Sequence, residues 1–105
     1  MSTTEQTIAK VLESIAPAEN VRARKMFGEY AVYCDEKVVA LVCDDELFVK
    51  DTAPGRQLAP DLELAPAYPG AKPGIHVPHA QWADTKWLSD LIRVTADALP
   101  AKKKK

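Results

Sequence analysis

Residues 24–50 alternate between apolar and polar side chains in a pattern that short β-strands joined by tight turns accommodate best. From Glu29 onward the period is two, which places successive side chains on opposite faces of a strand. Charged stretches at 35–37 and 44–45, which contain four acidic residues, interrupt this pattern and are typical of turns. The apolar run 38–43 between them predicts a central strand that is buried on both faces. Three strands joined by such short turns are expected to pair as antiparallel neighbours.

Two amphipathic helices are expected to flank this meander. The first carries apolar residues at the spacing of one helical face: Ile8, Val11, Leu12 and Ile15. Ser2 and Glu5 have the spacing of a capping box that starts this helix, and Pro17 ends it. The second follows Asp84, a favourable N-cap, and ends before Pro100, with an apolar face formed by Leu88, Leu91, Ile92, Thr95 and Leu99. Both helices must pack on another element, because isolated helices of this length are marginal in water.

Seven of the eight prolines lie in the second half of the chain, from Pro54 to Pro100. There we predict a short helix at 53–59 and short edge strands at 62–64 and 75–77, since proline is tolerated at the edge of a sheet. The expected fold class is α+β, with two layers, an antiparallel sheet and N- and C-terminal amphipathic helices in the order α-β-β-β-α-β-β-α. A chain of 105 residues supports one such domain, placed at 1–100 and followed by a lysine tail at 101–105.

The net charge of −1 conceals an acidic folded body. Lys102 to Lys105 supply four of the fourteen basic residues, and the other ten face fifteen acidic ones, which leaves a net charge of −5. An acidic body repels phosphate, so nucleic-acid binding would depend on the tail or on a local basic cluster. No apolar run approaches the roughly 20 residues that cross a bilayer, and the first residues lack the pattern of a secretory signal. The expected location is therefore the cytoplasm, without membrane contact.

The two cysteines are expected to be free, buried thiols. If the first hairpin turn centres on Glu36 and Lys37, Cys34 lies opposite Val39 and Cys43 lies opposite Tyr30. The two sulfur atoms would then be about 13 Å apart, well beyond the reach of a disulfide.

The residue types that could support catalysis or bind a metal are scattered. His76 and His79 could share a metal ion only in a helix, which Pro78 disfavours. The acidic residues 44–46 are adjacent, whereas divalent sites draw ligands from alternate positions or from several segments. We therefore expect no cofactor, no metal and no enzymatic activity. A small metal-dependent enzyme that uses both histidines and the acidic turn stays open as an alternative.

Aromatic residues next to basic ones are the best candidates for contacts with a partner. Arg24 and Lys25 precede aromatic residues at the start of the first predicted strand, and Lys50 closes the third. The candidate partner-binding set, expected to cluster near those two strand ends, is Arg24, Lys25, Phe27, Tyr30 and Lys50. Core packing is the competing interpretation for the aromatic members of this set. Trp82 and Trp87 are expected to pack in the core, with an exposed binding platform as the alternative.

The run RKMFGEYAVYCDEKVVALVCDDELFVK resembles the central motif of the TfoX N-terminal domain, in which a basic residue and MFG open a strand meander. The AYPG and HVPH stretches and the last helix also lie where that domain has its loop and final helix, so the resemblance covers about residues 4–99. It implies a single-domain member with an initial helix, a three-stranded meander, a middle helix, two further strands and a final helix. TfoX, also called Sxy, is a bacterial regulator of natural competence that is thought to assist a transcription factor.

The sequence thus predicts a non-enzymatic interaction domain that binds a protein partner, such as a transcription factor, as a monomer or a homodimer. Direct nucleic-acid binding is the first alternative. It would use the basic residues of the first half together with the lysine tail: Arg22, Arg24, Lys25 and 102–105.

Overall fold

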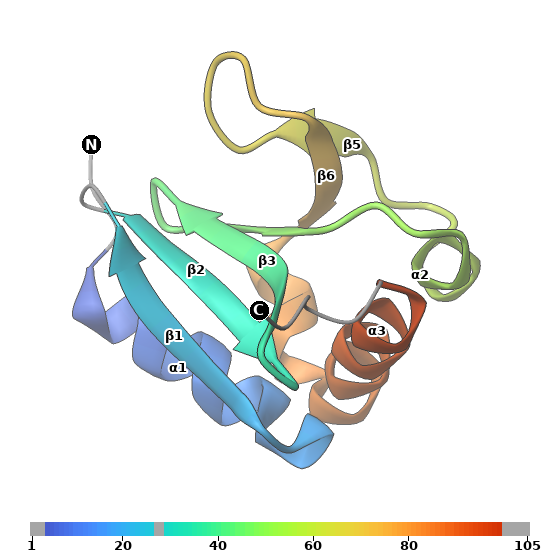
Figure 1. Cartoon of the computed structure of the whole chain (residues 1–105), viewed down its shortest axis with the longest axis horizontal. Coiled ribbons are helices and arrows are strands. Elements are labelled where there is room, and N and C mark those ends of the chain that lie inside the picture. The colour runs from blue at the N-terminus through green and yellow to red at the C-terminus, as the bar shows by residue number, and fades with distance from the viewer. Residues whose placement is uncertain (1–3, 27–28, 100–105) are drawn as a thin grey trace, which may run out of the picture.

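The computed structural model describes residues 4–26 and 29–99 and confirms the α+β fold class. Six strands form one antiparallel sheet in the spatial order β1-β2-β3-β4-β6-β5 (Figure 1). The strands are β1 (Val21–Met26), β2 (Glu29–Cys34), β3 (Lys37–Cys43), β4 (Glu46–Val49), β5 (Leu64–Pro66) and β6 (Pro73–Val77). The helices are α1 (Glu5–Ile15), α2 (Ala53–Leu58) and α3 (Thr85–Ala98), with 3₁₀ turns η1 (Ala16–Ala18) and η2 (His79–Ala83).

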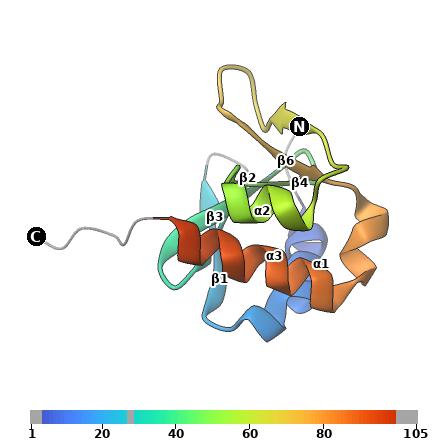
Figure 2. The same cartoon turned by 90° about the vertical axis from the view of Figure 1, so that its right-hand side faces the viewer.

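The helices form the second layer of the fold. β1 and β2 lie in front of α1 in Figure 1, and Figure 2 shows α2 lying against α3. α1 packs on β1 and on α3, while α3 packs on β2 and β3. None of the described helices is long and apolar enough to cross a membrane.

Strand β1 is an addition to the predicted order. Its sequence, VRARKM, mixes apolar residues and cations on both faces, so it has no apolar stripe that would mark it as a strand. Its six residues nevertheless pair with β2 without interruption, from Val21 opposite Cys34 to Met26 opposite Glu29. The sheet is therefore one strand wider than expected.

Helix α1 begins two residues later than predicted. Its N-cap is Thr4, whose hydroxyl accepts the N–H of Thr7, whereas Ser2 lies outside the described residues. The capping interaction therefore uses Thr4 in place of the predicted Ser2–Glu5 pair. The predicted apolar face is confirmed, because Ile8, Val11 and Ile15 are buried.

The register between β2 and β3 differs from the predicted one. Both hairpin loops contain two residues, Asp35–Glu36 and Asp44–Asp45, and all four have positive φ. Cys34 therefore faces Lys37 and not Val39, and a bulge between Val32 and Tyr33 shifts the pairing further along. The prediction of free thiols is confirmed, since both cysteines are unpaired and buried.

The proline-rich half forms the predicted helix α2 and both strands, but one strand lies elsewhere in the sheet. β6 is an interior strand, because it pairs with β4 on one side and with β5 on the other. Of these two strands only β5 lies at an edge of the sheet, and it starts at Leu64 rather than at residue 62. Its proline, Pro66, pairs with Pro73, where β6 begins, so the edge prediction failed only for β6.

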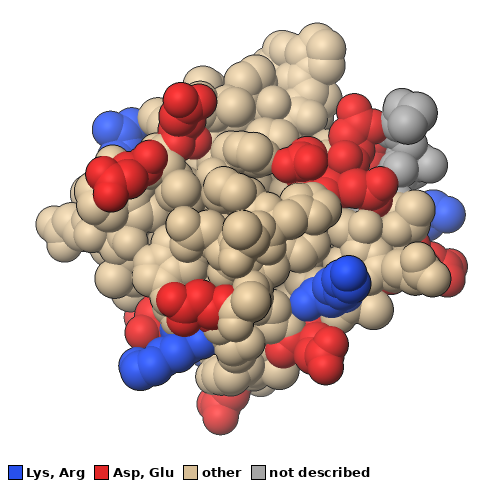
Figure 3. Space-filling model, turned by 180° about the vertical axis from the view of Figure 1, so that it is seen from behind, with Lys and Arg blue, Asp and Glu red and all other residues tan. Residues whose placement is uncertain are grey.

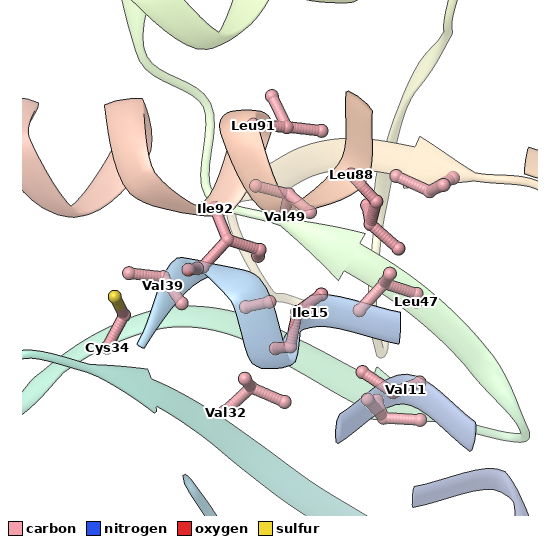
Figure 4. Packing of buried hydrophobic residues seen from close by; sticks show 14 of the residues in the cluster. Val11, Ile15, Val32, Cys34, Val39, Leu47, Val49, Leu88, Leu91 and Ile92 are labelled. Atoms are coloured by element: carbon pink, nitrogen blue, oxygen red, sulfur yellow. The ribbon is translucent and has the colours of Figure 1, made fainter. Parts of the chain in front are cut away.

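The core fills the space between the sheet and the helices. Side chains from both layers interdigitate there (Figure 4), among them Val11, Ile15, Val32, Val39, Leu47, Val49, Leu88, Leu91 and Ile92. Asp84 caps α3 as predicted by accepting the N–H of Trp87 at 3.2 Å. The indole N–H of Trp82 donates to the carbonyl of Val77 at 3.0 Å, and that of Trp87 donates to the carbonyl of Leu58 at 2.8 Å. Both tryptophans therefore pack against the core, as predicted.

Candidate interaction surface

The face of the sheet turned away from the helices carries a continuous row of side chains. Directly opposite residues of antiparallel strands point to the same face. The strand registers align one outer row across β1, β2, β3, β4 and β6: Arg24, Ala31, Leu41, Phe48 and His76. The adjacent row points into the core: Ala23, Val32, Ala40, Val49 and Ile75. The outer row is apolar in its middle and ends in a guanidinium at one side and an imidazole at the other.

The segment between β5 and β6 converts this face into a groove. Tyr68, 55% exposed, borders two adjoining pockets together with Leu41. The first pocket, about 480 Å³, is lined by Met26, Glu29, Tyr30, Leu41, Cys43 and Tyr68. The second, about 340 Å³, also contains Phe48, Lys50, Asp51, Lys72, Gly74 and Leu99. We call the two pockets together the sheet groove.

The close fit of β6 against β4 positions the wall of the groove. A Cβ atom on Gly74 would lie 2.9 Å from the carbonyl oxygen of Val49, closer than side-chain carbons approach. Phe48 and His76 lie next to each other on these two strands, with ring centroids 5.2 Å apart. Glycine at this position therefore allows β6 to carry the loop with Tyr68 beside the open face.

The histidines meet the second acidic turn at one end of the sheet. His76 Nε2 lies 2.6 Å from Glu46 Oε1, and His79 Nε2 lies 2.6 Å from the carbonyl oxygen of Asp45 and 3.6 Å from Glu46 Oε2. Asp45 in turn accepts hydrogen bonds from Thr7 and from the N–H of Thr4, which lower the pKa of its carboxyl group. These contacts join η2, β6, the turn and α1. Among residues 4–26 and 29–99, no three His, Cys, Asp or Glu side chains are arranged to hold a metal ion.

Both thiols are chemically quiet, including that of Cys43, which lies opposite the Glu46 carboxylate that contacts both histidines. Burial raises the pKa of Cys43, and the nearby carboxylates of Glu29 and Asp44 raise it further. Burial likewise raises the pKa of Cys34, whose thiol donates to the carbonyl of Glu19 at 3.5 Å. The protonated thiol is the weaker nucleophile, so neither cysteine is activated in this arrangement.

Comparison with known proteins identifies the fold family. The family model of the TfoX N-terminal domain matches residues 13–99. The chain belongs to the TfoX N-terminal domain family. This TfoX N-terminal domain is also 42% identical over 103 residues to a protein of Spirochaeta aurantia described as an uncharacterized 12.7 kDa protein in the trpE 5′ region. The similarity covers 98% of this chain and 89% of the relative.

The predicted contact residues of this TfoX N-terminal domain do not form one cluster. Tyr30 pairs with Val42, which pairs with Leu47, and Lys50 lies three residues further along the chain. The two candidates are therefore about 10 Å apart along the strands, with β3 between them. The clustering prediction was wrong because the start of the first strand and the end of the third lie at opposite ends of a meander.

Arg24, Tyr30 and Lys50 nevertheless border the open side of the sheet, whereas Lys25, opposite Tyr30, alternates with Arg24 and points to the other face. Tyr30 lines the first pocket, half-buried against the core, and Lys50 lines the second. Arg24 and Lys25 are exposed on β1, and Phe27 lies outside the described residues. Whether these residues contact a partner stays a prediction.

Three residues of the groove were missed by the sequence analysis: Leu41, Phe48 and Tyr68. Leu41 belongs to a run that was expected to be buried on both faces, yet it is only half-buried because none of the described helices covers its side of the sheet. The sequence pattern around Met26 likewise did not indicate that its side chain would be exposed at the groove. Tyr68 lies in the proline-rich segment, where no periodicity indicated its position.

Proposed function

We propose that this domain is a non-enzymatic, cytoplasmic interaction domain that binds a protein partner through the sheet groove. Its role would be in transcriptional regulation, as for TfoX in natural competence. The observation that carries the proposal is an apolar groove on a sheet face without helices, bordered by the exposed side chains of Met26 and Tyr68. Exposed, contiguous apolar surface with aromatic residues is typical of protein-binding sites.

The groove offers little to a chemical reaction, which supports a binding role. The carboxylate of Asp51 is held by Arg56 at 2.5 Å, and this hydrogen bond lowers the pKa of Asp51. The raised pKa of Cys43 keeps the thiol of the groove protonated. Free thiols are typical of a reducing compartment, which agrees with a cytoplasmic location.

Affinity capture from native cytoplasm tests the proposal, with two variants as a matched pair. Tyr68→Glu places a carboxylate at the junction of the two pockets, and Gln57→Glu places the same charge on the exposed surface of α2. We expect one reproducible partner whose affinity falls about tenfold or more with Tyr68→Glu and stays unchanged with Gln57→Glu. Absence of a reproducible partner, or equal loss with both variants, would contradict the proposal.

Direct nucleic-acid binding is less well supported by the charges of the described residues. Arg22 is paired with Glu36 at 2.7 Å and stacks on Tyr33, which leaves Arg24 and Lys25 as the accessible pair of the basic cluster. On the side shown in Figure 3, carboxylates are scattered over the described surface without a continuous basic patch. A salt titration with single-stranded DNA distinguishes the two functions, because phosphate contacts lose affinity steeply as ionic strength rises.

A further inference from the structure

Strand β1 is an open and regular edge of the sheet. All six of its residues pair with β2 without a bulge, and no strand lies on its other side among residues 4–26 and 29–99 (Figure 1). The opposite edge, β5, has three residues and contains Pro66, so it is poorly suited to strand pairing. Within the described sheet, β1 is therefore the edge that can accept another strand.

The hydrogen-bonding pattern shows which backbone groups of β1 are available. Asp35 N–H donates to the carbonyl oxygen of Asn20 at 3.1 Å. Because bonded and non-bonded pairs alternate along an antiparallel ladder, the N–H and C=O groups that point away from β2 belong to Val21, Ala23 and Lys25. These groups have no other partner among the described residues, so they form a row of donors and acceptors along the edge.

The side chains of β1 determine what kind of strand fits this edge. Arg22, Arg24 and Lys25 are exposed, and the strand has no acidic residue. A second copy paired antiparallel with Ala23 opposite its own counterpart would place Arg22 opposite Arg24, and directly opposed like charges are destabilising. These cations disfavour self-pairing, while they complement an acidic strand.

The inner side of the same edge is apolar at Val21 and Ala23 and ends in Lys25, which lies opposite Tyr30. Val21 and Ala23 are half-buried and pack on the core together with Leu12 of α1. An added strand would place alternate side chains against this apolar ledge and the remaining ones on the outer face, beside Arg22 and Arg24. Because side chains alternate along a strand, the occupant should alternate in the same way.

We propose that β1 is a strand-addition site for an extended segment of a partner protein in which acidic and apolar side chains alternate. This inference rests on the proposed function of protein binding, but it assigns a different surface, the backbone edge of β1, which adjoins the sheet groove at Met26. Main-chain hydrogen bonds supply affinity, and alternate side-chain contacts supply specificity in this mode of recognition.

The first experiment uses the full chain and a capped ten-residue peptide that alternates glutamate and valine, followed by NMR-detected hydrogen exchange. We expect the amides of Val21, Ala23 and Lys25 to gain about tenfold or greater protection, since they become hydrogen-bonded to the peptide. The amides of Arg22 and Arg24 should stay unchanged, because they already bond to β2. A peptide with lysine in place of glutamate should leave all five amides unchanged.

Two substitutions at Lys25 separate the contribution of the backbone hydrogen bond to peptide affinity from that of the side-chain charge. Lys25→Ala removes the cation alone, and Lys25→Pro also removes the outward N–H at an edge position that tolerates proline. We expect affinity for the acidic peptide to fall about threefold with Lys25→Ala. With Lys25→Pro it should be at least about tenfold lower than with Lys25→Ala. Arg24→Glu, which leaves the backbone intact, should also abolish binding of the acidic peptide and gives a second variant if the proline variant unfolds.

The results that would overturn the inference are distinct from those that bear on the groove. Equal affinity of Lys25→Pro and Lys25→Ala, or equal binding of the lysine peptide, would remove β1 as the site. So would a titration in which the signals of Leu41 and Tyr68 shift while the β1 amides stay unprotected. That last result would leave the proposed groove function standing, whereas failure of the capture experiment would leave β1 protection by the peptide unaffected.

Discussion

Six described residues other than glycine adopt left-handed backbone conformations, in three adjacent pairs: Glu19–Asn20, Asp35–Glu36 and Asp44–Asp45. Such conformations are unfavourable by about 1 kcal/mol for residues with a Cβ. Side-chain contacts offset part of this. Asp35 bonds to Asn20 and Arg93, and Asp45 bonds to Thr4 and Thr7. Contacts with distant parts of the chain thus add to the turn preference of the aspartates.

Glu36→Gly should stabilise the protein by about 0.5 kcal/mol. An Asp-Gly pair suits a two-residue hairpin loop with positive φ, and the exposed ion pair with Arg22 that is lost contributes little. The measurement is the urea midpoint at neutral pH. Glu36→Gln, which removes the ion pair and keeps the strained backbone, is the control and should give no gain. A lower urea midpoint for Glu36→Gly would show that the lost ion pair contributes more to stability than the relief of backbone strain.

Asp35→Asn should reduce the loss of folding stability that occurs as the pH is lowered. The hydrogen bonds from Arg93 and Asn20 lower the pKa of Asp35 in the folded protein, so folding favours its charged form. The resulting stability is present above the unfolded-state pKa of about 3.9 and is lost as pH falls through the lower folded-state pKa. Thermal unfolding measured between neutral pH and about pH 2 tests this. Asp61→Asn, the same charge change at an exposed residue, is the control, and parallel curves for wild type and Asp35→Asn would refute the prediction.

At the scale of elements, the sequence predicts strands and helices best where periodicity is strong. Helix α3 has an apolar face and a favourable N-cap, and both were recognised. Strand β1 was missed because it shows two half-buried small residues between cations, which is a pattern shared with exposed loops. β6 was placed at an edge because of its prolines, yet Pro73 stands at its first residue, where a missing N–H does not interrupt pairing with β4.

The packing of β6 against β4 gives a prediction at this scale. Gly74→Ala should destabilise the protein by about 1 to 3 kcal/mol, because the new methyl group would lie 2.9 Å from the carbonyl oxygen of Val49. Chemical denaturation measures the change. Gly70→Ala is the comparison. The φ of 88° at Gly70 is strained for alanine, but the added Cβ would meet no atom beyond its chain neighbours within 4 Å. The loss of stability in Gly70→Ala should therefore stay near 1 kcal/mol. A Gly74→Ala variant with the same free energy of unfolding as the wild type would mean that β4 and β6 can move apart easily.

At the scale of the whole molecule, one core joins the two helical termini of the chain to the sheet. Ile15 is fully buried where α1, α3 and the sheet meet (Figure 4). Arg93 of α3 supports the same junction from outside, because it donates to the carbonyl of Ala18 and to Asp35. Since the helices of the described residues lie on one face of the sheet, that part of the chain leaves the other face open to a partner.

Ile15→Ala should therefore lower the free energy of unfolding by about 2 to 5 kcal/mol through loss of apolar burial and creation of a cavity. Leu12→Ala is the control, since Leu12 is only half-buried on the same helix and should lose less. Urea unfolding followed by circular dichroism measures both. Equal losses would indicate that the core does not concentrate at Ile15.

Local patterns in the chain were sufficient for the fold class, the two long helices, the β2–β3–β4 meander and the family, because periodicity, capping and turn residues act between near neighbours. The pairing of segments that are distant in sequence could not be predicted from these local patterns. The position of β6 beside β4, the bulge that sets the β2–β3 register, and the placement of Tyr68 beside Leu41 all depend on which surfaces can be buried together. Both proposed binding surfaces arise from that non-local packing. It leaves one sheet face and one strand edge uncovered in the described structure, and no local pattern in the sequence indicates which ones.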